Sequence, residues 1–117
     1  MEHRAYLMRL KRDKIQDYVE IHKKEKIWES IVQGLKRAGF NKMIIFHYGQ
    51  DIILFEEAEN LKKSYAVLDK DKDSAAWDTM VAEWMEEYYP TWNEIKKEIE
   101  FKEIPVVFYL EGGVMKH

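Results

Sequence analysis

Tyr18 and His22 are the two side chains whose types and spacing best suit acid–base chemistry. They lie four residues apart in a stretch with helical periodicity, so both project from the same face of one helix. The unperturbed pKa of histidine lies near neutrality, which suits His22 to release and take up protons. We expect His22 at a helix C-terminus, where the helix dipole favours the protonated imidazole. The residues alone leave a structural interpretation open, in which both are edge residues hydrogen-bonded to the backbone.

A second cluster lies in the stretch SAAWDTMVAEWMEEYY, where large apolar residues recur at three- and four-residue spacing. This spacing predicts a core-facing helix. Trp77 falls in its first turn, where a cleft often opens, and an indole there can stack on the apolar face of a sugar ring. Glu56 and Glu57 end a strand on opposite faces, where either is a candidate general base; rim charges are the preferred interpretation.

Several common catalytic motifs are missing. The chain has no cysteine, which excludes disulfides, thiol catalysis and thiolate metal sites. It contains no HExxH and no zinc-type spacing of histidines and carboxylates, so we expect no metal. The absence of GxSxG, GxGxxG and GxxxxGK[ST] argues against acyl transfer and nucleotide loops. We therefore expect no cofactor.

The first helical region, residues 13–38, changes phase part-way along. One apolar stripe ends at His22 and a second begins at Trp28, and the two lie nearly half a turn apart on a continuous helix. One straight helix cannot bury both stripes against one sheet. The charged residues 23–26 mark the expected break, and Gly39 is the expected left-handed cap.

Strand patterns flank this region and recur at the C-terminus. We predict strands at residues 4–11, 43–48, 52–57 and 104–110, and further helices from residue 60, at residues 74–89 with Ser74 as N-cap, and at residues 91–98. The order βαββαβ predicts an α+β, ferredoxin-like domain over residues 1–117, with an antiparallel sheet and its helices on one face. The other face needs cover, for which we expect a homodimer; a cleft roofed by loops is the alternative.

Composition limits the function classes. The chain has 117 residues, a net charge of −3 and 46% hydrophobic residues. Mixed charge signs give no indication of nucleic-acid binding. No apolar run is long enough for a membrane span, and the charged start lacks the apolar core of a signal peptide, so we expect a cytoplasmic protein without membrane contact.

Short motifs run in order along nearly the whole chain. They are Arg4-Ala5-Tyr6 with Met8, Tyr18-x3-His22, Ile27-Trp28, Leu35-Lys36 with Gly39, Leu54-Phe55, Trp77-x-x-Met80, and Val107 to Leu110. In these motifs the chain resembles the L-rhamnose mutarotases, small proteins of the dimeric α/β barrel group. The resemblance implies cofactor-free interconversion of the α and β anomers of L-rhamnose or a related 6-deoxy sugar such as L-fucose, by acid–base ring opening in a homodimer. It implies that His22 is the proton donor, that Tyr18 contacts a substrate hydroxyl, and that Trp77 lines the pocket.

Two departures bear on the choice of sugar. Met43 stands where the family has a substrate-contacting tyrosine, and Ala76-Trp77 stands for a pair of tryptophans. Losing a phenol and an indole changes the hydrogen bonds and the width of the pocket, so the sugar can differ from rhamnose. His47, on the same strand face as Met43, is a candidate replacement polar group.

Two other functions remain open at this point. The same fold group includes haem-degrading and quinone-forming monooxygenases, in which a helix histidine can bind iron. A non-catalytic sugar-binding or regulatory module is the other alternative, in which the changes at Met43 and Ala76 mark lost catalysis.

Overall fold

Strand β1 (Glu2–Leu10) lies at the centre of an antiparallel sheet. One edge of β1 pairs with β3 (Asp51–Ala58), which pairs in turn with β2 (Phe40–Tyr48), and the other edge pairs with β4 (Met85–Glu87). The strand order β2-β3-β1-β4 is that of a ferredoxin-like α+β fold, which confirms the predicted fold class. This is a computed structural model, and it describes residues 1–117 except the side chain of Trp92.

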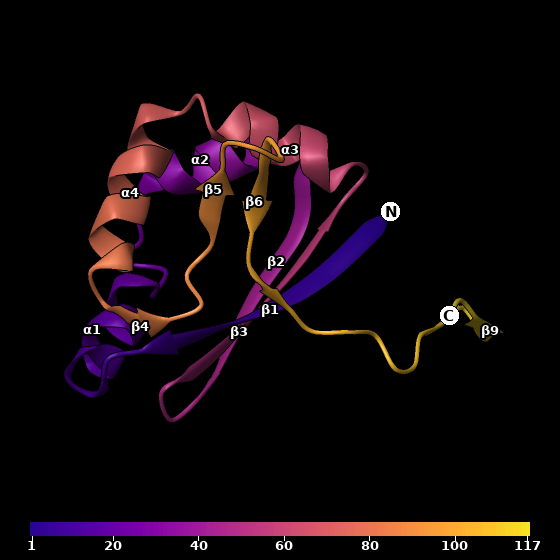
Figure 1. The fold of residues 1–117 in the computed structure, drawn as a ribbon, viewed down its shortest axis with the longest axis horizontal. Coiled ribbons are helices and arrows are strands. Elements are labelled where there is room, and N and C mark those ends of the chain that lie inside the picture. Colours follow the sequence, from indigo (N-terminus) through magenta and orange to yellow (C-terminus); the bar gives the residue numbers. More distant parts are fainter.

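Four helices lie on one side of this sheet (Figure 1). They are α1 (Ile15–Ile21), which follows a short 3-10 turn at Arg12–Lys14, then α2 (Glu29–Arg37), α3 (Leu61–Leu68) and α4 (Lys72–Ala82). The break predicted in the first helical region is confirmed, because residues 22–28 separate α1 from α2. Gly39 follows α2 with φ +92°, the left-handed conformation expected of its cap. None of the helices in the described part of the chain is long and apolar enough to cross a membrane.

The predicted helix over residues 74–89 is wrong at both ends. Asp71, not Ser74, is its N-cap, since the Asp71 carboxylate accepts hydrogen bonds from the backbone N–H groups of Asp73 and Ser74. The helix ends at Ala82 because the following residues pair with β1: Lys11 donates its N–H to the carbonyl of Trp84 at 2.9 Å. A sheet edge that needs hydrogen-bond partners thus overrides helical periodicity here.

The predicted helix at residues 91–98 is also wrong, because this segment is a hairpin of β5 (Thr91–Asn93) and β6 (Glu98–Glu100). The side-chain oxygen of Asn93 accepts the N–H groups of Ile95 and Lys96 and so shapes the turn. Lys97 completes the turn at φ +55°. Hydrogen bonds to the side chain of Asn93 therefore stabilise a turn where the short helical pattern predicted a helix.

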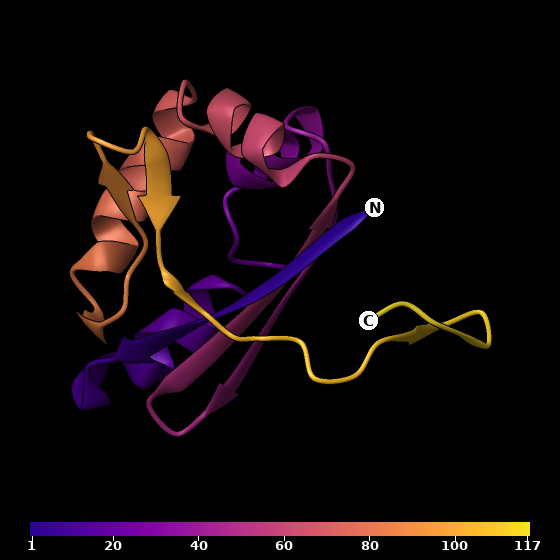
Figure 2. The same cartoon turned by 45° about the vertical axis from the view of Figure 1, so that its right-hand side comes forward.

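The strand predicted at residues 104–110 does not form. In its place the short strand β7 (Lys102–Glu103) pairs with β1, and Ile104 adds one hydrogen bond, from its N–H to the carbonyl of Ala5 at 2.8 Å. Pro105 has no N–H, so it cannot continue the ladder, and the chain leaves the sheet. It ends in a small hairpin of β8 (Leu110–Glu111) and β9 (Val114–Met115), away from the body of the fold (Figure 2).

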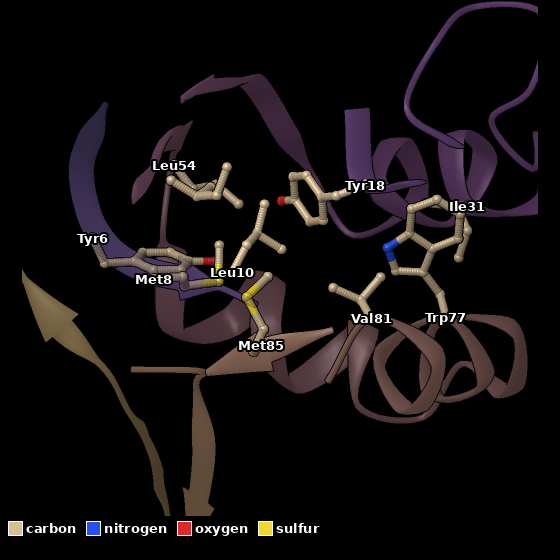
Figure 3. Packing of buried hydrophobic residues seen from close by; sticks show 10 residues of the cluster. Tyr6, Met8, Leu10, Tyr18, Ile31, Leu54, Trp77, Val81 and Met85 are labelled. Atoms are coloured by element: carbon tan, nitrogen blue, oxygen red, sulfur yellow. The ribbon is translucent and has the colours of Figure 1, made fainter. Parts of the chain in front are cut away.

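Alternation along the strands separates a buried inner sheet face from an open outer one. The inner face of β1 and β3 contributes half of the buried core, and residues from α1, α2, α4 and β4 contribute the other half (Figure 3). The members of this cluster are Tyr6, Met8, Leu10, Tyr18, Ile31, Ile52, Leu54, Trp77, Val81 and Met85. On the outer face, Ile44, Phe46 and Tyr48 of β2 and Ile53 of β3 remain exposed. The C-terminal segment touches the outer face at one end, where Tyr109 packs edge-on against His3.

Asp71→Ala is expected to reduce the free energy of unfolding by about 1–2 kcal/mol, because two N–H groups of α4 lose their cap. The carboxylate also pairs with Arg37 at 3.2 Å. Asp73→Ala is the matched control, since it removes a carboxyl from the same helical turn but no capping bond, and it should cost less than half as much. Urea denaturation measures both variants, and equal losses would contradict the capping role.

Candidate functional site

A cavity of about 340 Å³ lies between the inner face of the sheet, the helices and the β5–β6 hairpin. That volume is within the range of small-molecule binding sites. Its walls are largely apolar, with a few polar groups contributed by tyrosines, one histidine, one serine and two aspartates. The lining includes Tyr6, Tyr18, His22, Met43, Tyr65, Asp69, Trp77, Asp78 and Tyr89. An apolar pocket with few polar groups suits a ligand that has both an apolar face and hydroxyl groups.

His22 lies at the wall of this cavity, one residue beyond the end of α1. Its Nδ1 is 2.6 Å from the backbone carbonyl oxygen of Tyr18. A carbonyl oxygen only accepts hydrogen bonds, so Nδ1 carries a proton and, in the neutral ring, Nε2 holds the free lone pair. The sequence left open that His22 bonds to the backbone. This hydrogen bond is present, and it determines which tautomer the neutral ring adopts.

Burial determines the charge of His22. Desolvation lowers its pKa below the ordinary value of 6.5, and the hydrogen bond to the Tyr18 carbonyl opposes this shift only in part. The imidazole is consequently neutral at pH 7 in the free protein. The sequence led us to expect that the helix C-terminus favours the protonated imidazole; in the structure desolvation is the largest effect on the pKa of this ring, and it favours the neutral form.

Two aromatic rings enclose the imidazole. The Tyr18 ring lies 4.3 Å from it, and the Trp77 ring meets it edge-on at 5.2 Å, measured between centroids. Trp28 packs edge-on against Trp77 at 5.1 Å. Tyr18, His22 and Trp77, which the sequence singled out separately, are thus brought together at one cavity wall.

Trp77 belongs to both the core and the cavity. It is 9% exposed and packs in the main hydrophobic cluster, and it also lines the cavity. Tyr18 is likewise buried, and desolvation raises the pKa of its hydroxyl, which stays protonated and able to donate a hydrogen bond. Figure 3 shows the hydroxyls of Tyr18 and Tyr6 pointing into the same interior space.

Sequence reasoning missed a second polar cluster, which adjoins the cavity away from His22. Glu56 is fully buried and so is not a rim charge. The Arg4 guanidinium donates to its Oε1 at 2.7 and 2.8 Å, and the Tyr65 hydroxyl donates to its Oε2. The hydroxyls of Tyr65 and Tyr6 are 3.4 Å apart. The sequence did contain one indication that Glu56 is buried: by strand alternation it shares a face with Ile52 and Leu54.

Asp78 and Tyr89 form another polar pair that the sequence did not indicate. The Tyr89 hydroxyl donates to Asp78 Oδ1 at 3.1 Å, and both residues line the cavity. Asp78 as a residue is more exposed than Glu56, yet partial burial of its carboxyl raises its pKa, and the hydrogen bond from Tyr89 opposes this shift. Its hydrogen bond ties α4 to the segment that leads into the β5–β6 hairpin.

The two departures from the expected family pattern have different outcomes. Met43 lines the cavity, whereas Ala76 does not; its neighbour Ala75 does. His47 shares the strand face of Met43, as predicted, but it is exposed and is not among the lining residues, so it supplies no replacement polar group there. Across the described residues, no three histidines, aspartates or glutamates are placed to hold a metal ion.

Comparison with known proteins now identifies the family. Residues 3–110 match the sequence profile of the L-rhamnose mutarotases. The chain belongs to the L-rhamnose mutarotase family. It is therefore assigned to a family of isomerases. Among curated proteins, no sequence matches significantly.

Solved structures resemble this mutarotase-family chain in fold. The crystal structure of an L-rhamnose mutarotase from Formosa agariphila is 22% identical, with a TM-score of 0.68, and the match covers 95% of this chain and 100% of that one. Tetracenomycin F2 cyclase from Streptomyces glaucescens is 11% identical, with a TM-score of 0.57 and 96% and 99% coverage. A Nitrosomonas europaea protein described as an antibiotic biosynthesis monooxygenase is 14% identical, with a TM-score of 0.54 and 90% and 88% coverage. At these identities the likenesses show the fold alone.

The lowered pKa of His22 predicts a specific pH dependence of stability in this mutarotase-family protein. As the pH falls below the ordinary histidine pKa of 6.5, the unfolded chain binds a proton at this residue and the folded chain does not. Between about pH 7.5 and 5, wild-type stability should therefore decrease more steeply than that of His22→Gln. Urea denaturation across this range measures the difference.

His47→Gln is the matched control, because it changes an exposed histidine in the same way. It should retain the wild-type slope. A wild-type slope no steeper than that of His22→Gln would contradict a lowered pKa of His22.

Proposed function

We propose that this protein interconverts the α and β anomers of L-rhamnose or of a related 6-deoxy sugar such as L-fucose. The observation that carries the proposal is a histidine whose lowered pKa favours the neutral ring and whose Nε2 carries the lone pair, at the wall of an apolar cavity in a chain of the mutarotase family. The ring faces of a sugar and the methyl group of a 6-deoxy sugar suit apolar walls, and its hydroxyls need a few hydrogen-bonding groups. We also propose that the protein acts in the cytoplasm.

Mutarotation requires two proton transfers at the anomeric centre. One group removes the proton from the anomeric hydroxyl while another protonates the ring oxygen, and the C1–O5 bond breaks to give the open aldehyde. The carbonyl then rotates by half a turn, and the ring closes on its other face. Each group reverses its role during closure, so every proton returns to its starting place.

We assign the first of these roles to His22. Its Nε2 lone pair takes the proton of the anomeric hydroxyl during opening, and the hydrogen bond from Nδ1 to Tyr18 stabilises the imidazolium that forms. During closure the imidazolium returns the proton to the carbonyl oxygen. The family resemblance implies His22 as the proton donor; we instead make it the proton acceptor of the opening step, because its lowered pKa favours the neutral imidazole. The Tyr18 hydroxyl donates to a sugar oxygen, and Trp77 lines the pocket against the sugar ring.

His22→Ala should abolish enzyme-dependent exchange between anomers, with a rate loss of about 100-fold or more. Saturation-transfer NMR measures this exchange. When one anomeric proton of L-rhamnose, L-fucose or another aldose is irradiated, the saturation reaches the other anomer only if the two anomers interconvert. His47→Ala is the matched control and should exchange anomers at the wild-type rate. Absence of exchange with every sugar in the wild-type protein would exclude the proposed activity.

We also propose that two copies of the chain associate through the outer face of the sheet. The support is the exposed apolar patch of Ile44, Phe46, Tyr48 and Ile53, which lies on the face opposite the helices. These side chains are 38–89% exposed. A contiguous apolar patch of this kind on a sheet marks an interaction surface, and a second copy presents a matching patch.

Phe46→Asp should convert the proposed dimer into a monomer, because it places a charge in the middle of the apolar patch. Sedimentation equilibrium at micromolar concentration measures the mass. Val67→Asp is the matched control, since Val67 is similarly exposed, 50% against 55%, but lies on α3, on the helical side of the sheet. A monomeric wild-type protein would refute the dimer.

A further inference from the structure

Glu56 occupies a position where the strand pattern calls for an apolar side chain. Its neighbours on the inner face of β3 are Ile52, Leu54 and Ala58, all buried. Glu56 itself has no exposed surface. Burying a carboxylate is costly even when it is paired, and apolar side chains of similar volume often stabilise such a site equally well or better. A role beyond stability is therefore the better explanation of this residue.

Both oxygens of Glu56 have defined partners. Arg4, directly opposite on β1, binds Oε1 at 2.7 Å, and the Phe101 ring covers its guanidinium at 4.2 Å from the ring centroid. Oε2 accepts a hydrogen bond from the Tyr65 hydroxyl. One oxygen is thus held by a fixed charge, while the other connects to a hydroxyl that can pass on a proton.

The hydrogen-bonded chain continues from Glu56 to the cavity. The Tyr65 hydroxyl lies 3.4 Å from the Tyr6 hydroxyl, and both tyrosines line the cavity. The Tyr6 hydroxyl points into the interior space that the Tyr18 hydroxyl also faces (Figure 3). A buried carboxyl group is therefore connected to the cavity through two phenols, each of which can donate and accept.

We propose that Glu56, Tyr65 and Tyr6 form a proton relay that exchanges a proton with the ring oxygen of the bound sugar. This inference rests on the proposed mutarotase activity and names its second acid–base group. Tyr6 is the catalytic residue of the relay, because its hydroxyl meets the sugar. Glu56 and Tyr65 act through it, and Arg4 positions Glu56.

Every proton in the proposed reaction has a donor and an acceptor. During opening, the anomeric O1–H bond breaks and Nε2–H of His22 forms, while the ring oxygen takes the Tyr6 proton as the C1–O5 bond breaks. Tyr6 is reprotonated by Tyr65, and Tyr65 by the protonated carboxyl of Glu56. Closure reverses every transfer, so His22 ends neutral and Glu56 ends protonated. While the sugar is open, His22 carries one additional proton and Glu56 lacks one. No further reactant is needed.

The hydrogen bonds of the relay can run in either direction. When Glu56 is ionised, Tyr65 donates to it and Tyr6 donates to Tyr65. When Glu56 is protonated, each bond reverses and the Tyr6 proton points into the cavity. Burial raises the pKa of Glu56, more than Arg4 and Tyr65 lower it, which favours this second form. The lowered pKa of His22 favours the neutral imidazole, so the two shifts together favour the neutral pair with which the proposed opening begins.

The other carboxyl groups at the cavity fit this role less well. Asp69 is exposed, so its proton exchanges directly with water. Partial burial also raises the pKa of the Asp78 carboxyl, but that group is already engaged by the Tyr89 hydroxyl. Glu56, by contrast, has no surface exposed to solvent. A proton passed from Glu56 through phenols reaches the sugar without involving bulk water.

Glu56→Gln and Tyr6→Phe test the relay. The glutamine amide keeps the shape and volume of the glutamate side chain but cannot release a proton, and the Tyr6→Phe substitution removes a single oxygen. We expect kcat to fall about 100-fold or more in each variant, with KM changed by less than about threefold. In wild type, activity should fall as the pH rises above the pKa of Glu56, and this alkaline limb should be lost in Glu56→Gln.

Glu57→Gln is the matched control, because it makes the same change one residue along, on the opposite face of β3. It should retain wild-type kcat and the alkaline limb. An active wild type with kcat and pH profile unchanged in both Glu56→Gln and Tyr6→Phe overturns the relay and leaves the mutarotase standing. A wild type inactive on every sugar overturns both. If Glu56→Gln does not fold, Tyr6→Phe alone decides, by the same loss of kcat.

Discussion

The fold depends on strand β1, whose hydrogen bonds and side chains serve every other part of the structure. One edge of β1 holds β3 and through it β2, and the other is shared by β4 and β7. Its inner side chains run from Arg4 through Tyr6 and Met8 to Leu10, so one strand passes from an ion pair through the cavity wall to the centre of the core. Because the sheet is covered by helices on this face, each inner position of β1 has to be packed or paired.

Burial shifts the pKa values of His22, which lines the cavity, and of Glu56, which lies behind the cavity wall, in opposite directions. It disfavours the charged form of each, and so lowers the pKa of His22 and raises that of Glu56. Both groups are thereby shifted toward the neutral state, one as a base with a free lone pair and the other as an acid with a proton to give. This arrangement suits a reaction that needs a base and an acid together and consumes neither.

The cyclase and the monooxygenase-like protein show how little the backbone alone says about chemistry. Their folds match this chain at TM-scores of 0.57 and 0.54, although their names describe unrelated reactions. An antiparallel sheet with helices on one face provides a cavity between the layers, and the side chains that line it determine the reaction. Here those side chains are a histidine at a helix end, a tryptophan from α4, and a set of tyrosines backed by a buried carboxyl group.

The sequence by itself determined the elements that depend on local periodicity and local caps. The alternation in β1, β2 and β3, the break after His22 and the cap at Gly39 are all properties of neighbouring residues. The i, i+4 spacing of Tyr18 and His22 likewise fixed their shared face. The family motifs extended this to a fold, because their order along the chain is itself sequence information.

Only the tertiary structure decided what the C-terminal third does and which polar groups meet. Residues 85–87 become a strand because the free edge of β1 needs partners, and Pro105 ends the last pairing because it has no N–H to donate. The charge of His22 depends on how deeply the fold buries it. The connection from Glu56 to Tyr6 passes through Tyr65, which lies on α3, the helix after β3 in the chain. Periodicity places a residue on a face, but desolvation and hydrogen bonding across elements exist only once those faces are packed together.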